Sequence, residues 1–172
     1  MKSATQKVNR AISAAVATVG AKAHIEDLPG SEPLNEDANL REVALEVFEE
    51  LAGKNGYSYN EKWMASSTDM GDISTLFPSI HMYTNGAIGN SHGIDYLIED
   101  PYTACVMGAK AEVGLICKLL SNGAEKAKKI ISEFKPVFAS VEEYLAHKHS
   151  LSLDKDTVIY NEDGTVTLDY KN

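Results

Sequence analysis

The first thirty residues combine one helix pattern with one strand pattern, and this combination limits the possible folds more than any other feature. The helix ends at Gly20, and its apolar side chains share one face, at Val8, Ile12, Ala15 and Val19. Residues 21–26 then alternate in polarity, as a half-buried strand does, before a break at residues 27–30. One helix and one strand cannot bury each other's apolar faces, because a stable domain needs packed layers. We therefore expect this segment to be half of a larger unit.

Length and charge exclude several classes of protein. The chain has 172 residues, enough for one ordinary domain with a core but barely enough for two. Its formal net charge of −9 argues against nucleic acid as a partner, since phosphate binding depends on clustered Lys and Arg. No apolar run approaches the roughly 20 residues of a membrane helix, and the first seven residues lack the apolar core of a signal peptide. We expect a soluble, cytoplasmic protein with no membrane partner.

The middle of the chain predicts a linker, two helices and a strand. Residues 31–35 have linker character, and an amphipathic helix follows. Asn35 or Asp37 can cap its start, and Gly53 ends it. Its apolar face consists of Leu40, Val43, Ala44, Val47 and Leu51. Residues 76–83 are rich enough in large apolar side chains to predict a strand. Asp100 and Pro101 predict the start of a second helix. Small side chains over residues 104–114 lead us to expect that this helix packs in an interior.

The last third predicts two helices and a hairpin. A shorter helix spans about 124–134, and Ser140 with Glu143 forms a capping box for a helix that runs to about residue 148. Asp163-Gly164 predicts the turn of a hairpin over residues 157–168. Cys105 and Cys117 lie about 18 Å apart in one predicted helix, too far apart for a disulfide. We expect both to be small buried hydrophobic residues in a reducing compartment.

Residues 64–93 hold most of the side chains that are able to do chemistry. His92 lies in a predicted loop that contains three glycines, where an imidazole can reach a metal or a substrate. Asp69 and Asp72 can orient a ligand or cap local turns, and capping is favoured for Asp72. His81 can orient another metal ligand through a hydrogen bond or serve as a satisfied structural histidine.

The other motifs are weak or absent. His147 and His149 point to different helix faces, and His24 lies on the polar face of its predicted strand, so we expect all three to be ordinary surface residues. Gly89-Asn-Ser-His-Gly93 has the spacing Gly-x-Ser-x-Gly, but it lies in a predicted loop and not in the turn between a strand and a helix that a nucleophile elbow requires. The chain has no phosphate loop, Gly-x-Gly-x-x-Gly or Cys-x-x-Cys. Metal-assisted hydrolysis needs three or more converging ligands and an open position for water. The candidates here predict part of such a site.

A series of short motifs runs over most of the chain. The motifs are Val8-Asn-Arg-Ala-Ile, Asp27-Leu-Pro-Gly-Ser-Glu-Pro-Leu34, Ser66-Ser-Thr-Asp-Met-Gly-Asp72, Pro78-Ser-Ile-His81, Ser91-His-Gly93 and Asp100-Pro-Tyr-Thr-Ala-Cys105. In this order they resemble the C-terminal part of the M20 family of metallo-amidohydrolases. The subgroup most similar includes aminobenzoyl-glutamate hydrolases and M20-domain dipeptidases.

The resemblance implies an α/β fold. Residues 1–30 would be the remnant, one helix and one strand, of an α+β lid or dimerisation domain. Residues 31–172 would be the C-terminal part of a zinc-peptidase-like α/β catalytic domain, with a terminal helix and β-hairpin. In the family, the general base and most metal ligands come from an N-terminal half that has no counterpart in this chain, so the resemblance assigns no catalytic residue here.

The resemblance also implies site residues and a reaction. His92 matches the one metal ligand supplied by the C-terminal half, although many relatives have Ser or Thr and then Pro after this histidine, where this chain has Gly93 and Ile94. Ser67, Thr68, Asp69 and His81 would contact the substrate or orient metal ligands. The intact enzyme would use two divalent ions, zinc, manganese or cobalt, to activate water against an amide bond. Substrates would be N-acyl amino acids, aminobenzoyl-glutamate-like amides or small dipeptides.

Two hypotheses follow for the chain itself. In the first, it is a fragment of a metal-dependent amidohydrolase that retains metal poorly and is inactive alone, because one imidazole neither holds a divalent ion tightly nor activates water. Its partners would be the N-terminal half or further copies of the chain. In the second, it is a non-catalytic binding or assembly module that keeps part of the hydrolase fold and uses exposed apolar surface to bind.

Overall fold

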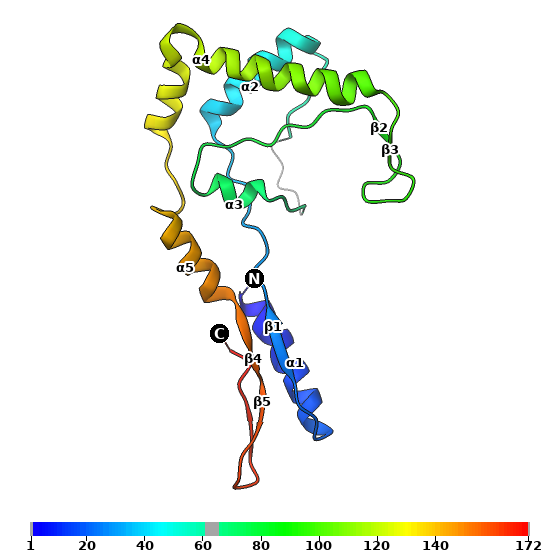
Figure 1. The fold of residues 1–172 in the computed structure, drawn as a ribbon, viewed down its shortest axis with the longest axis vertical. Helices are drawn as coiled ribbons and strands as arrows, with labels where there is room; N and C mark the ends of the chain where they lie inside the picture. The colour runs from blue at the N-terminus through cyan, green and yellow to red at the C-terminus, as the bar shows by residue number, and fades with distance from the viewer. Residues whose placement is uncertain (1, 61–65, 172) are drawn as a thin grey trace. The chain divides into compact units, whose positions relative to one another are not determined.

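The computed structural model describes residues 2–60 and 66–171, and these residues form helices and small antiparallel sheets (Figure 1). They fall into two compact units. The first unit contains Met1–Gly30 and Phe138–Asn172, and the second contains Ser31–Val137. The architecture is therefore mixed α and β, with every sheet in the described residues made of two strands.

The first unit joins the beginning of the chain to its end. It contains α1 (Lys2–Thr18), β1 (His24–Asp27), α5 (Val141–Leu151), β4 (Leu153–Asp156), β5 (Val158–Tyr160) and β6 (Val166–Leu168). β1 pairs antiparallel with β4, and β5 pairs antiparallel with β6. The apolar core consists of Ile25, Leu153 and Val158. Beside it, the buried Ser13 hydroxyl of α1 donates to the Thr157 hydroxyl at 2.8 Å. The opening helix and strand thus find their packing partner in residues 153–168.

The division of the chain in space differs from the division expected from sequence. The expected boundary between residues 30 and 31 also separates the two units, but residues 138–172 return to the first unit. The return depends on a strand register that pairs His24 with Asp156, and no local pattern encodes a pairing between residues so far apart. The assignment of lid and catalytic parts stays a prediction.

The second unit is built on two packed helices. It contains α2 (Ala38–Ala52), α3 (Met70–Ser74), β2 (Ala87–Ile88), β3 (Leu97–Ile98), a π-helical turn η1 (Tyr102–Met107) and α4 (Gly108–Glu133), which is broken by non-helical backbone at residues 121–124. α2 packs along α4, and the buried apolar residues of this unit are Val43, Ala44, Val47, Ala111 and Ile130. As predicted, Asp37 caps α2 by accepting from the Leu40 amide at 2.8 Å.

Several other local predictions are confirmed. The Ser140 hydroxyl accepts from the Glu143 amide at the start of α5, as the capping box requires. Asp100 begins a helical segment by accepting from the amides of Tyr102 and Thr103. The turn between β5 and β6 falls at Gly164, which has a φ of 84° that glycine adopts without strain.

Three local predictions are wrong. Residues 76–83 form turns and irregular backbone, and no strand is present there. Cys105 and Cys117 are exposed rather than buried. The helical region over 104–114 also remains largely outside the core, since Ala111 is its one fully buried residue. The predicted burial of the cysteines and of residues 104–114 fails for one reason. α2 covers one face of α4, and the side chains on the other faces reach the surface.

No helix within residues 2–60 and 66–171 is long and apolar enough to cross a membrane.

The close approach of α2 and α4 predicts opposite effects for two glycines of α4. A Cβ added at Gly114 would lie 2.8 Å from Cγ1 of the buried Val47, whereas one at Gly108 would meet Thr84 Cγ2 at an ordinary 3.4 Å. We expect Gly114→Ala to lower the free energy of unfolding by about 1–3 kcal/mol through overpacking. Gly108→Ala should raise it by up to about 1 kcal/mol through helix propensity. Urea denaturation measures both, and equal values for the two variants would contradict this packing.

Candidate functional site

The loop before α3 presents three of the predicted site residues. Ser67 and Asp69 are exposed, and Thr68 is half-buried. The Thr68 carbonyl accepts from the Gly71 amide at 2.9 Å, and its hydroxyl accepts from the Met70 amide at 3.3 Å, so Thr68 organises the turn that leads into α3. Asp69 stands at the N-cap position, but its side chain makes no capping hydrogen bond. The Asp69 carboxylate is thus left at the surface of the loop.

Asp72 has a longer-range role than the local capping favoured from sequence. Its carboxylate accepts from the Glu32 amide at 3.0 Å, and nearby the Ser74 hydroxyl accepts from the Asn35 amide at 2.9 Å. A Cβ at Gly71 would lie 1.8 Å from the Glu32 carbonyl oxygen, so glycine is required for this backbone approach. α3 and the segment before α2 are therefore held together, which gives the 66–72 loop a fixed base.

His81 contacts an aromatic neighbour. Its ring lies 4.5 Å from the Tyr83 ring, and Nδ1 is 3.3 Å from the Tyr83 hydroxyl. The imidazole is half-buried. This environment suits a structural histidine, and the alternative role of orienting another metal ligand stays a prediction.

His92 lies in the loop between β2 and β3, and Figure 1 shows where this loop leaves the second unit. Its side chain is exposed, and its φ of 63° lies in the left-handed region that non-glycine residues seldom adopt. The loop is closed around it by the Gly93 amide donating to the Asn90 carbonyl at 2.7 Å and by the Asp95 carboxylate accepting from the Asn90 side-chain amide at 3.1 Å. The imidazole is thus accessible to a ligand, as the sequence analysis predicts.

These residues do not form a metal centre by themselves. Across residues 2–60 and 66–171, no group of three or more His, Cys, Asp or Glu side chains is arranged to hold a metal ion. The hydrogen bonds given above for Thr68, His81 and the His92 loop run within their own segments. Within these ranges, the donor set therefore does not fit a resident divalent ion.

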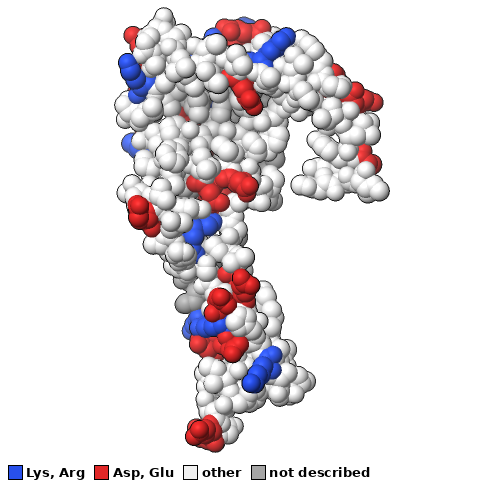
Figure 2. All heavy atoms as spheres, viewed as in Figure 1, with Lys and Arg blue, Asp and Glu red and all other residues white. Residues whose placement is uncertain are grey.

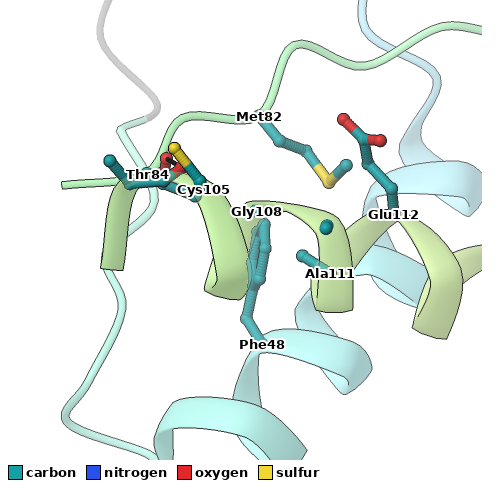
Figure 3. A pocket seen from close by; sticks show the side chains of 9 residues that line it. Phe48, Met82, Thr84, Cys105, Gly108, Ala111 and Glu112 are labelled. Atoms are coloured by element: carbon teal, nitrogen blue, oxygen red, sulfur yellow. Dashed lines mark hydrogen bonds between the residues drawn. The ribbon is translucent and has the colours of Figure 1, made fainter. Parts of the chain in front are cut away.

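A pocket that the sequence did not indicate lies between α2 and the start of α4 (Figure 3). Its volume is about 310 Å³, and Phe48 of α2 points toward Gly108 and Ala111 of α4 at its base. Met82 and Glu112 lie at another side of the pocket. The small side chains that make room for it are visible in the sequence, but the position of Phe48 against them depends on helix packing. Its lining combines small and apolar side chains with a carboxylate, a thiol and a hydroxyl, so its mixed polarity assigns no class of ligand.

His24 is the second feature that the sequence analysis missed. Its Nε2 lies 2.8 Å from Asp154 Oδ1, and its Nδ1 lies 3.0 Å from Asp156 Oδ1. These hydrogen bonds, first that to Asp156 and then that to Asp154, raise the pKa of His24 above its ordinary value of 6.5. The alternation of polarity placed His24 on an exposed face, but the partners come from a strand 130 residues later.

On the face shown in Figure 2, Lys and Arg side chains are interspersed with Asp and Glu.

Comparison of the chain with models of protein families, with curated proteins and with solved structures found no match.

The incomplete donor set predicts poor metal retention. After treatment with a chelator and addition of one equivalent of Zn²⁺, Mn²⁺ or Co²⁺, we expect dialysis to remove the ion from the isolated chain, because a single imidazole holds it weakly. Metal content by atomic emission measures this. His92→Ala should retain the same amount as the parent chain. One equivalent that survives dialysis in the parent and is lost in His92→Ala would contradict the prediction.

Proposed function

We propose that this chain is the C-terminal part of a metal-dependent amidohydrolase. Its substrates would be N-acyl amino acids, aminobenzoyl-glutamate-like amides or small dipeptides, and it would act only with a polypeptide that supplies the remaining ligands and the general base. The proposal rests on the ordered resemblance of its motifs to the M20 family. The finer fold assignment, a zinc-peptidase-like catalytic domain preceded by a lid remnant, belongs to the same proposal.

The main support for a further polypeptide is that the chain exposes more surface than compact domains of the same lengths would. Two separate compact domains with the lengths of the two units would together expose about 9,900 Å². The chain exposes 11941 Å². An excess of this size, together with the two-stranded sheets of the described residues, supports a fold that another polypeptide completes.

Part of that excess is apolar and lies along α4. Val113, Ile116 and Leu120 follow helical spacing on one face, and their exposed fractions are 59%, 54% and 63%. An apolar stripe on both sides of a helix is typical of a helix packed between two layers. α2 forms one layer, and the proposed partner would supply the other.

In this proposal the chain supplies only part of the active site. His92 would supply one metal ligand from its exposed loop, and the other ligands would come from the partner. Ser67, Thr68 and Asp69 would contact the substrate from a loop whose base is held by Asp72, and His81 would orient a neighbouring group.

The alternative function is a non-catalytic binding or assembly module, and the same apolar face of α4 favours it. The two functions differ in what His92 does. A module that binds through α4 has no requirement for the His92 imidazole, whereas a split hydrolase depends on it.

Complementation tests the proposal. The chain would be mixed with the N-terminal half of an M20-family aminobenzoyl-glutamate hydrolase in the presence of Zn²⁺ or Mn²⁺, and release of glutamate from aminobenzoyl-glutamate would be measured. We expect no activity from either part alone and activity from the mixture. His92→Ala should reduce the activity of the mixture at least 100-fold, because removal of a ligand leaves the ion weakly held.

His149→Ala serves as the matched control, since His149 is an exposed histidine of α5 in the other unit. It should leave the activity of the mixture unchanged. If the two parts form a stable complex that has no activity, or if His92→Ala is as active as the parent chain, the hydrolase assignment is wrong and the assembly module is favoured.

A further inference from the structure

His24 is held between two carboxylates of the strand opposite. In the antiparallel register of β1 and β4, His24 faces Asp156 and Glu26 faces Asp154. Both ring nitrogens of His24 are within hydrogen-bond distance of a carboxylate oxygen, at 2.8 Å for Asp154 and 3.0 Å for Asp156. The imidazole therefore bridges two positions of β4 from one position of β1.

The two faces of this ladder differ in charge. The exposed face consists of His24, Glu26, Asp154 and Asp156, so protonated His24 is the one cation among three carboxylates. The opposite face carries the buried Ile25 and Leu153. Its charged groups are paired elsewhere, Asp27 with Asn9 of α1 at 2.5 Å and Lys155 with Asp169 at 2.8 Å. Successive side chains of a strand point to opposite faces, so Asp27 and Lys155, with the Asp169 that Lys155 contacts, do not share the face of the imidazole.

The cluster does not form a metal site. The two aspartates approach different nitrogens of the ring, so their oxygens lie on different sides of the imidazole and do not converge with a free ring nitrogen on one point. Nor do three or more His, Cys, Asp or Glu side chains gather to hold a metal ion anywhere in residues 2–60 and 66–171.

A carboxylate accepts hydrogen bonds and donates none, so both contacts are satisfied only when both ring nitrogens carry a proton. We propose that His24, Asp154 and Asp156 form a pH-sensitive latch, which holds β1 on β4 while the imidazole is protonated and loosens when it loses a proton. The neutral ring keeps one donor and turns a lone pair toward the other aspartate, and the face is then left with three negative charges and no positive charge.

The direction of the pH dependence follows from the contacts. Hydrogen bonds to Asp156 and Asp154 raise the pKa of His24 above 6.5. The stabilisation is therefore fully present below pH 6.5 and is lost as the pH rises through the raised pKa. Because 58% of the His24 side chain is accessible to solvent, water screens the interaction and the effect is a local one. Loosening would increase local opening of the ladder beside His24, where the Thr157 amide donates to the Ala23 carbonyl.

Hydrogen exchange of backbone amides in the full chain tests the latch. The Thr157 amide, which donates to the Ala23 carbonyl beside the latch at 2.8 Å, is the probe. The Val137 amide, which donates to the Thr75 carbonyl in the second unit, is the internal control. After division by the intrinsic exchange rates, we expect the opening of the Thr157 amide to increase roughly threefold between pH 6 and pH 8. The Val137 amide should not change.

Variants at exposed positions separate the latch from general pH effects. His24→Gln removes the titrating group, and Asp154→Asn with Asp156→Asn removes its partners, so each should make the opening of the Thr157 amide independent of pH. His149→Gln, at an exposed histidine outside the ladder, should keep the pH dependence of the parent chain. A parent chain whose Thr157 amide opens equally at both pH values, or a His24→Gln variant that keeps the increase, would overturn the proposal.

Discussion

Burial of apolar side chains is limited in both units, and the rest of the structure depends on how the two small cores are completed. The first unit buries Ile25, Leu153 and Val158, and the second buries Val43, Ala44, Val47, Ala111 and Ile130. Each fully buried large apolar side chain contributes about 1.5–3 kcal/mol, and ordering the backbone costs about 1–2 kcal/mol per residue. Because apolar burial is small, polar contacts and close helix packing do more than usual to determine which segments pack together.

Those contacts differ between the units. The first unit uses a buried hydroxyl pair, Ser13 with Thr157, and an exposed imidazole held by two aspartates to bring distant segments together. The second unit relies on Gly114, which lets α4 approach the Val47 side chain of α2. Of these contacts, only that of His24 contains a titrating group, whereas the contact at Gly114 depends on side-chain volume.

The apolar face that α4 leaves exposed connects the fold to the proposed function. A helix with apolar residues on two sides lowers its free energy when a second layer covers it, and the accessible surface of the chain exceeds that of two compact domains of the same lengths. The split-hydrolase and assembly-module hypotheses both use this face. They differ at His92, which only the hydrolase requires, so that residue rather than the fold decides between them.

Local sequence determined much of this protein, and long-range packing decided the rest. The caps at Asp37 and Ser140 and the turn at Gly164 were predictable because each depends on hydrogen bonds or φ angles within a few residues. The exposed position of His92 was likewise predictable from its glycine-rich loop. The return of residues 138–172 to the first unit, the carboxylates beside His24 and the exposure of α4 were not predictable. The first two depend on pairing between segments more than a hundred residues apart, and the third depends on how few segments cover the helix. The periodicity of residues along the chain contains no information about distant pairing or about the covering of a helix.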